Sequence, residues 1–184
     1  MRIAVIGPQN TGKSTFIKDF LVAFPEYTTP KETYRDLVKR NELAINQNAT
    51  EENQRLIRDF LYNQVRSNKV KNIIFDRCII DNYIYTLAQA EKGVISQKFL
   101  KETEVAMYDS LQFIGTLIFI PTAVSVHLVG DKLRDTDTIF IDHINCLFVE
   151  TLLKIAKRST IEIILVSGGR QTRIKEVKKK LLAE

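Results

Sequence analysis

The stretch Gly7-Pro8-Gln9-Asn10-Thr11-Gly12-Lys13-Ser14 decides the fold, because it matches the phosphate-binding pattern GxxxxGK[ST] at every position. The apolar run Arg2 to Ile6 precedes it and helically spaced apolar residues follow it, as a strand and a helix around such a loop require. Glycines at both ends let the backbone curl so that N–H groups point inward, and the positive end of the following helix adds to them. The stretch therefore predicts a site for the phosphates of ATP or GTP.

The polar residues of this loop have separate expected tasks. We expect Lys13 to reach the β and γ phosphates, Ser14 to bind Mg²⁺ and Thr15 to assist at the α phosphate. The loop residues predicted to bind the nucleotide are Gly7, Asn10, Thr11, Gly12, Lys13, Ser14 and Thr15.

A second signal lies at the end of a later apolar strand, where Asn72 to Phe75 leads into Asp76. P-loop proteins place a carboxylate at such a position beside the metal, so Asp76 and Ser14 are the predicted Mg²⁺ ligands. The alternative is a carboxylate that caps the strand end or pairs with Arg77.

The residues around Asp76 distinguish among classes of P-loop protein. Mechanical ATPases usually carry a second acid directly after it to polarise water, whereas this chain has Arg77. The segment Asn68 to Lys71 fails the guanine-binding pattern NKxD at its last position, and the sequence has no DxxG switch. Kinases fit better, since they need basic residues around the transferred phosphoryl group and an acid that orients the acceptor.

Composition and charge are those of a soluble globular protein. The 184 residues are 45% hydrophobic and 27% charged, which predicts one domain over residues 1–184. The net charge of +5 suits either a nucleic-acid partner or a phosphate-neutralising pocket. Much of the surplus falls in Lys175 and in Lys178 to Lys180, where the apolar spacing favours the solvated face of a terminal helix over a nucleic-acid patch.

The remaining composition signals exclude several classes of site. Cys78 and Cys146 have no metal-ligand spacing, and His127 and His143 have no partner for a metal site or a triad, so each histidine is predicted to be structural. The apolar run Ile3 to Ile6 is too short to predict a signal peptide, and no apolar stretch of the sequence approaches bilayer length. We therefore expect a cytoplasmic protein with no membrane partner.

Short β-branched runs alternate with helical patterns along the chain, which predicts a three-layer α/β P-loop fold with about five mainly parallel strands and flanking helices. The expected strands are Arg2 to Ile6, Asn72 to Phe75, Thr116 to Ile120, Ile161 to Val166 and a weaker one near Tyr27 to Thr29. The expected helices include Thr50 to Ser67, Asp81 to Glu91, Ser96 to Ser110 and Asp135 to Lys157.

The segment Asp76-Arg77-Cys78-Ile79-Ile80-Asp81-Asn82-Tyr83-Ile84-Tyr85 resembles the DR-x-x-x-D-x-x-x-Y element of small P-loop kinases. It is most similar to the ribosylnicotinamide kinases of the NadR type and to AAA-28-like ATP-binding proteins, and more loosely to thymidylate kinases. Glu32 to Arg35 stands in the place of the family's E-x-x-R element, and Asp131 to Asp137 resembles its lid. These elements follow one another in the family's order over most of the chain.

The resemblance implies roles for residues outside the phosphate loop. Glu32, Arg35, Arg77, Asp81 and Tyr83 are the expected substrate-binding residues, and Glu32 or Asp76 is expected to orient the acceptor hydroxyl. Glu32 would lie at the carboxyl end of the second strand; the alternative is a surface pair with Arg35 on one helix turn.

Two further arginines are assigned on the same basis. Arg134 lies in the expected lid, about residues 128–140, and would bring a cation to the transferred phosphoryl group; pairing with Asp131 or Asp137 is the alternative. Arg170 or Arg173 would stack on adenine after the last strand, unless Ser167 to Arg170 is a simple strand-to-helix turn.

These observations predict an enzyme that uses ATP and Mg²⁺, with catalytic residues Lys13, Glu32, Asp76 and Arg134. The expected acceptor is a nucleoside, ribosylnicotinamide or a nucleoside monophosphate. A polynucleotide 5'-hydroxyl kinase and a regulatory ATP-binding switch without phosphotransfer are the alternatives. The pattern leaves the oligomeric state open.

Overall fold

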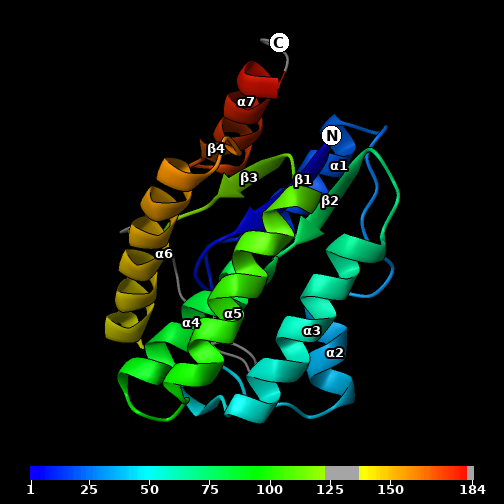
Figure 1. The fold of residues 1–184 in the computed structure, drawn as a ribbon. Coiled ribbons are helices and arrows are strands. Elements are labelled where there is room, and N and C mark those ends of the chain that lie inside the picture. Colours follow the sequence, from blue (N-terminus) through cyan, green and yellow to red (C-terminus); the bar gives the residue numbers. More distant parts are fainter. Residues whose placement is uncertain (123–136, 182–184) are drawn as a thin grey trace.

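The computed structural model describes residues 1–122 and 137–181. Within these ranges, four parallel strands form one sheet: β1 (Arg2–Ile6), β2 (Ile73–Asp76), β3 (Thr116–Phe119) and β4 (Glu162–Leu165). Seven α-helices flank it (Figure 1), namely α1 (Lys13–Ala23), α2 (Tyr34–Arg40), α3 (Glu51–Ser67), α4 (Ile79–Glu91), α5 (Gln97–Ser110), α6 (Thr138–Arg158) and α7 (Arg170–Leu181). This is the predicted P-loop α/β architecture.

The strand order β2-β1-β3-β4 places the site. In the register, Ile3 of β1 lies opposite Ile74 of β2 on one side and opposite Thr116 of β3 on the other. The connection from β1 to β2 therefore runs to one side of β1, and the next connection, from β2 to β3, crosses to its other side. Open α/β sheets bind ligands at such a point, outside the carboxyl ends of the strands. The phosphate loop follows β1 at that edge.

The prediction of about five strands was one too many for the described part of the chain. Near the expected weak strand, Thr28 forms a single parallel bridge to Ile73: its N–H donates to Asn72 O at 3.1 Å, and Ile74 N donates to Thr28 O at 2.9 Å. Pro25 and Pro30 flank this position. Because proline has no N–H to donate to a ladder, the pairing cannot extend far.

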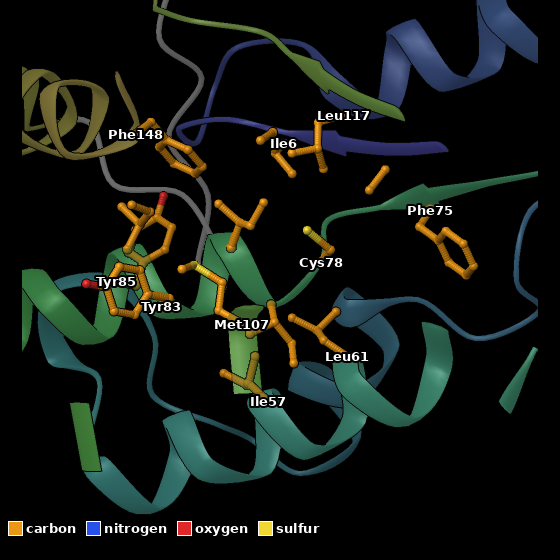
Figure 2. Packing of buried hydrophobic residues seen from close by; sticks show 14 of the residues in the cluster. Ile6, Ile57, Leu61, Phe75, Cys78, Tyr83, Tyr85, Met107, Leu117 and Phe148 are labelled. Carbon is orange, nitrogen blue, oxygen red and sulfur yellow. The ribbon is translucent and has the colours of Figure 1, made fainter. Parts of the chain in front are cut away.

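Alternate residues of the strands supply two hydrophobic layers, one on each face of the sheet. On one face, Ala4 and Ile6 of β1 pack with Ile57 and Leu61 of α3 and with Phe148 of α6 (Figure 2). The other face carries residues of β1, β3 and β4 that pack with α1 and α7; they include Ile3, Val5, Ile118 and Ile164. Burial on both faces explains why β1, β2 and β3 read as nearly continuous apolar runs.

Capping side chains set the helix boundaries. Thr50 Oγ1 accepts from Asn53 N at 3.2 Å before α3, and Ser96 Oγ accepts from Phe99 N at 3.2 Å before α5, which confirms the predicted starts. The other two predicted starts were displaced. Helix α4 begins two residues earlier, because Asp81 is its N3 residue and accepts from Cys78 N at 3.2 Å. Helix α6 begins at Thr138, because Asp137 Oδ1 accepts from Ile139 N at 3.0 Å.

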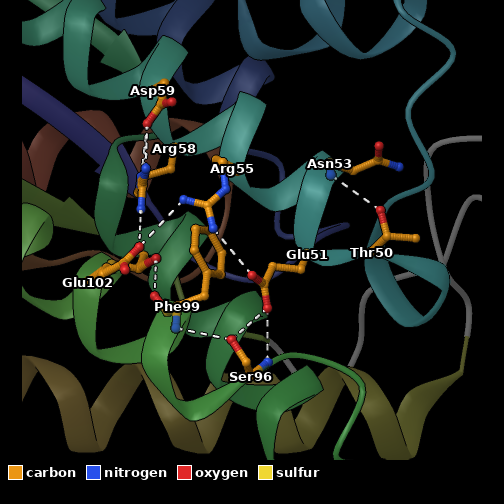
Figure 3. Close-up of polar contacts among 10 residues, drawn as sticks. Thr50, Glu51, Asn53, Arg55, Arg58, Asp59, Ser96, Phe99 and Glu102 are labelled. Carbon is orange, nitrogen blue, oxygen red and sulfur yellow. Dashed lines mark hydrogen bonds and ion pairs between the residues drawn. The ribbon is translucent and has the colours of Figure 1, made fainter.

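Polar contacts join α3 to α5 on their exposed sides (Figure 3). Arg55 pairs with Glu51 at 3.2 Å and with Glu102 at 3.4 Å, and its guanidinium lies 4.5 Å from the centroid of the Phe99 ring. Glu51 also accepts from Ser96 N at 3.0 Å. Exposed ion pairs contribute little stability singly, so their main effect here is to fix the relative position of the two helices. None of the described helices is both long and apolar enough to cross a bilayer.

Candidate functional site

The phosphate loop has the backbone that its two glycines permit. Gly7 has φ 142°, and a Cβ there would lie 2.2 Å from the carbonyl oxygen of Ile120. Gly12, the N-cap of α1, has φ 81° in the left-handed region. A side chain at position 7 would collide with a neighbouring strand end, and one at position 12 would strain the backbone. The loop therefore curls against the edge of the sheet, with the N-terminus of α1 at its end.

Lys13 is buried inside this curl. Its ammonium donates to Gly7 O at 2.7 Å and to the carbonyl of Pro8, and lies 3.4 Å from Thr11 Oγ1. Burial lowers the pKa of Lys13 to about 7, and the positive charge of Arg77 adds to this effect, while Asp81 and Asp76 act in the opposite direction. Burial thus destabilises the charged form of Lys13 in the centre of the loop, and a negatively charged ligand would stabilise it.

Ser14 and Asp76, the two residues predicted to be ligands of one metal, lie side by side. Ser14 Oγ donates to Asp76 Oδ2 at 3.1 Å, across 62 residues of sequence. Hydroxyl and carboxylate oxygens are the donors that Mg²⁺ takes, usually with only one or two protein ligands besides water and phosphate. The pair fits such an ion. The described residues hold no cluster of three or more acidic, histidine or cysteine side chains that would bind a metal by themselves.

Arg77 and Asp81 form a buried ion pair beneath the loop. Arg77 Nη1 donates to Asp81 Oδ1 at 3.0 Å, and the same oxygen accepts from Gly7 N at 3.4 Å. Arg77 has φ 78°, and its guanidinium lies 4.9 Å from the centroid of the Tyr34 ring. Burial raises the pKa of the Asp81 carboxyl, against the opposing charges of Arg77 and Lys13. Asp81 therefore supports the phosphate loop, and its contact with substrate stays a prediction.

Two neighbouring tyrosines of α4 face different ways. Tyr83 is buried next to Glu104 and Tyr108 of α5, and burial raises its pKa to about 12. The neighbours of Tyr83 thus belong to α5, and its contact with substrate stays a prediction. Tyr85 faces the loop instead: its hydroxyl accepts from Gln9 N at 3.3 Å and bonds to the side-chain amide oxygen of Gln9.

Sequence reasoning chose Tyr83 rather than Tyr85 as a substrate-binding residue and did not predict the contact between Tyr85 and Gln9. A usable signal was present, because Tyr85 follows Asp81 by four residues and residues four apart share a helix face. The assignment of Asp81 to the site therefore pointed to Tyr85 rather than to Tyr83.

The two residues expected from the E-x-x-R element lie apart. The carboxylate of Glu32 forms an ion pair with Arg40, and no ion pair joins it to Arg35 in the described ranges. The alternative of a Glu32–Arg35 pair on one helix turn was therefore wrong, since Thr33 caps α2 and leaves Glu32 outside it. Arg35 lies close enough to Lys13 for its charge to lower the pKa of that lysine. The general-base role of Glu32 stays a prediction.

A pocket of about 240 Å³ lies beside the loop, between α1 and the turn after β4. Its lining residues are Asn10, Thr11, Gly12, Thr15, Phe16, Asp19, Gly168, Gly169, Arg170 and Arg173. Arg170 pairs with Asp19 through two contacts of 2.6 and 2.8 Å, whereas Arg173 Nη1 donates to Thr11 O at 2.7 Å. Both arginines thus border this pocket, and Arg173 also holds the loop; their predicted stacking on adenine stays a prediction.

The remaining sequence assignments concern the expected lid before α6 and the two histidines. Arg134, Asp131 and His127 lie outside the described residues, as does most of the expected lid. Asp137, at the end of that segment, caps α6 and accepts from Gln47 Nε2 at 3.1 Å. His143 is exposed on α6 and lies 2.7 Å from Glu91, which agrees with a structural role.

The chain is similar to known proteins in sequence and in fold. Residues 2–173 match a family model, AAA_28, described as an AAA domain. A comparison with curated protein sequences found no match.

Solved structures share the fold at low identity. The deoxyadenosine kinase of M. mycoides, with dCMP and dCDP bound, is 17% identical over all of both chains, with a TM-score of 0.72. The NadR protein in complex with NR is 14% identical over 96% of this chain, with a TM-score of 0.68, and this chain spans half of its length. The thymidylate kinase of Candida albicans is 18% identical over 98% of this chain and 90% of its own, with a TM-score of 0.66.

Proposed function

Because the chain belongs to the AAA_28 family of AAA domains and shares the fold of three small kinases, we propose that it is an ATP-dependent phosphotransferase. In this proposal residues 1–184 act as one kinase domain that moves the γ-phosphoryl group of ATP to a small nucleoside-type or nucleotide acceptor. The observation that carries the proposal is the contact of 3.1 Å between Ser14 Oγ and Asp76 Oδ2, beside the buried ammonium of Lys13. This contact places the two expected metal ligands beside the lysine that is expected to bind phosphate.

On the donor side, the chain supplies charge and fixed N–H groups. The curled backbone from Gly7 to Gly12 and the N-terminus of α1 favour phosphate oxygens, and Lys13 gives up its carbonyl contacts for the β and γ phosphates. Mg²⁺, held by Ser14 and Asp76, would neutralise charge that develops between the β and γ phosphate oxygens. The pocket bordered by Arg170 and Arg173 would take the base.

On the acceptor side, the first turn of α4 and the start of α2 face the loop. Arg77 and Arg35 place two cations near Lys13, which suits a group that is negatively charged during transfer. Arg77 follows Asp76 where a mechanical ATPase has a second acid, so this position supplies no carboxylate to activate water. The ligands named for the similar structures, dCMP and NR, support a nucleoside-type acceptor.

Transfer of label measures the proposed reaction directly. The protein is incubated with Mg²⁺, γ-labelled ATP or GTP, and a panel of nucleosides, nucleoside monophosphates, ribosylnicotinamide and a 5'-hydroxyl oligonucleotide. We expect label on a small acceptor with wild-type protein, and neither ATP binding nor transfer with Lys13→Ala.

The remaining outcomes separate the alternatives. Label on the oligonucleotide instead of a small acceptor would support a polynucleotide kinase. ATP binding without transfer to any acceptor would overturn the phosphotransferase proposal in favour of a switch. Glu32→Gln should keep ATP binding and lose transfer rate; unchanged turnover would assign the acceptor hydroxyl to Asp76.

A further inference from the structure

Helix α6 carries large apolar side chains on the side that faces away from the core. Its buried face packs against the sheet and α4, through residues such as Phe148 and Ile155. The helix lies at the margin of the molecule (Figure 1), and on its outer side Ile139 is 82% exposed, Val149 42% and Leu153 60%. Single apolar side chains are common on a protein surface, but several on one helix face indicate an interaction site.

The spacing of these exposed residues is that of a contact between two helices. Along α6 they recur at alternating steps of three and four residues, which is the a/d pattern with which two helices pack side by side. A helix that packs only on its own domain needs one apolar face, whereas α6 has two. The members of the outer face, called the α6 stripe below, are all exposed: Ile139, Asp142, Cys146, Val149, Leu153 and Ala156.

Charges are distributed unevenly along the α6 stripe. Its one acid, Asp142, lies near the start of the helix, whereas Lys154 and Lys157 lie near the end. None of the three has an ion-pair partner among the described residues. A second α6 helix that runs in the opposite direction would bring its own lysines to Asp142 and its own acid to these lysines, whereas a parallel one would place like charges together. The stripe is therefore complementary to itself in the antiparallel direction.

We propose that the α6 stripe is an interface between two copies of this chain, whose α6 helices pack antiparallel about a twofold axis. The inference goes beyond the proposed function and does not depend on it. In an antiparallel pair, a positions of one helix meet d positions of the other, so Cys146 of each copy faces Val149 of the other. Leu153 of each copy then faces Asp142 of the other. Because the same surface serves both copies, the contact closes at two chains.

Asp142 fixes this register. Its carboxylate lies opposite a leucine, but within about 6 Å along the helix axis of Lys154 and Lys157 of the second copy. A single polar residue in an otherwise apolar seam selects one alignment, at some cost in stability. In the same alignment, Ile139 at one end of the stripe faces Ala156 at the other, so the whole stripe is covered.

The size of the α6 stripe predicts a reversible dimer. Helix α6 has 21 residues and is therefore about 31 Å long. A contact of one helix width along this length is small beside the roughly 1,200 Å² or more that stable interfaces bury. We therefore expect dimers at protein concentrations on the order of 100 µM, and their dissociation on dilution.

Leu153→Lys tests the interface with little risk of unfolding, because Leu153 is already 60% exposed and lysine is a good helix former. Sedimentation velocity over a series of protein concentrations should show a monomer–dimer equilibrium for the wild-type protein and a monomer for this variant. The matched control is Val105→Lys on α5, since Val105 is 65% exposed on another helix. The control should leave the dimer unchanged. At a dilution where the wild-type protein is monomeric, all three proteins should have the same melting temperature.

Charge reversal tests the antiparallel direction. Asp142→Lys brings a lysine to Lys154 and Lys157 of the second copy, twice in each dimer, and should raise the Kd of the dimer by about tenfold or more. The triple variant Asp142→Lys, Lys154→Glu, Lys157→Glu restores opposite charges across the interface and should return the Kd toward the wild-type value. In a parallel dimer each of these residues would face its own copy, so that neither variant would alter the Kd.

The outcomes are distinct. A wild-type protein that stays monomeric at the highest concentration would overturn the interface, as would a dimer that persists in Leu153→Lys or is lost in Val105→Lys. An unchanged Kd in Asp142→Lys, or a triple variant no tighter than Asp142→Lys, would overturn the antiparallel arrangement. Loss of the dimer in Leu153→Lys together with recovery in the triple variant supports the proposal, and no nucleotide is needed for either measurement.

Discussion

At the scale of single residues, the contact between Ser14 and Asp76 is the part of the site with the clearest chemistry. The two oxygens meet at 3.1 Å although 62 residues separate them in the chain. Asp76 is partly exposed at the end of β2, so its carboxylate can bond to a hydrated ion as well as to the serine. The pair therefore joins the phosphate loop to the neighbouring strand through one small region of negative charge.

Asp76→Asn should reduce the rate of phosphate transfer by about 100-fold, because the amide keeps the shape of the side chain but loses the charge that binds Mg²⁺. The Mg²⁺ concentration that gives half of the maximal rate should rise. Titration of activity with Mg²⁺ at saturating ATP measures both effects. Asp59→Asn, an exposed carboxylate of α3 that pairs with Arg58, is the control and should leave the Mg²⁺ dependence unchanged. An unaltered Mg²⁺ dependence in Asp76→Asn would show that the metal is bound elsewhere.

The lowered pKa of Lys13 gives the second prediction at this scale. With a pKa of about 7 in the folded protein, Lys13 is largely neutral at pH 8 and must take up a proton when it binds phosphate. We expect the Kd for ATP to rise as the pH increases from 7 to 9, and about one proton to be taken up for each ATP bound at pH 8. Calorimetry in two buffers of different ionisation enthalpy measures this uptake.

The same shift affects stability with a definite sign. Between about pH 7 and the ordinary pKa of lysine, the unfolded chain binds a proton that the folded chain does not, so the contribution of Lys13 to stability increases with pH across that window and does not change further below pH 7. Lys13→Arg keeps its charge throughout the range and should show neither the proton uptake nor this increase. Equal proton uptake in both proteins would contradict the assignment to Lys13.

At the scale of elements, the first turns of α4 support the phosphate loop. Asp81 accepts from Gly7 N, and Tyr85, one turn later, bonds to both the backbone and the side chain of Gln9. The helix that carries the expected acceptor residues therefore also sets the shape of the donor loop. Tyr85 is a positioning residue in this arrangement.

Tyr85→Phe and Tyr83→Phe form a matched pair, since each removes one hydroxyl from a buried tyrosine of the same helix. Tyr85→Phe should raise the KM for ATP several-fold and leave the KM for the acceptor nearly unchanged, because the lost bond of about 1 kcal/mol belongs to Gln9 in the loop. Tyr83→Phe should change neither constant. Initial-rate kinetics with each substrate varied in turn measure both KM values. Equal effects of the two changes on the KM for ATP would contradict the assignment of the loop contact to Tyr85 rather than to Tyr83.

At the scale of the whole molecule, the nucleotide would contact segments that are far apart in sequence. The loop after β1, the end of β2 and the turn before α7 all border the donor site, and Arg173 joins the last of these to Thr11 O across 162 residues. A ligand that binds all three in the folded state alone stabilises the molecule as a unit.

Mg²⁺ and ATP together should therefore raise the melting temperature. At 100 times the Kd, the expected gain is about 2.7 kcal/mol in the free energy of unfolding. Thermal denaturation with ATP at several concentrations measures the gain, and Arg173→Met should reduce it, because the loop then loses its contact with the end of the chain. A gain that is unaltered in Arg173→Met would separate α7 from nucleotide binding.

Most of the donor half of the site was predictable from the sequence, for local physical reasons. Gly7 and Gly12 are required by their own backbone angles, Lys13 and Ser14 follow at fixed positions on the start of α1, and Asp76 ends a strand that must lie parallel to β1. The starts of α3 and α5 were likewise predictable, because Thr50 and Ser96 cap them within three residues. Such features depend on neighbours along the chain.

What only the tertiary structure decided is which side chains meet across long separations. Gln9 meets Tyr85 rather than Tyr83, Glu32 pairs with Arg40, and Asn82 is oriented by Gln54 of another helix. The rotation of α4 about its axis determines the first and last of these contacts, and it is set by how that helix packs between α3, α5 and α6. Helical periodicity defines the faces of α4, but the packing of the whole molecule determines what each face contacts.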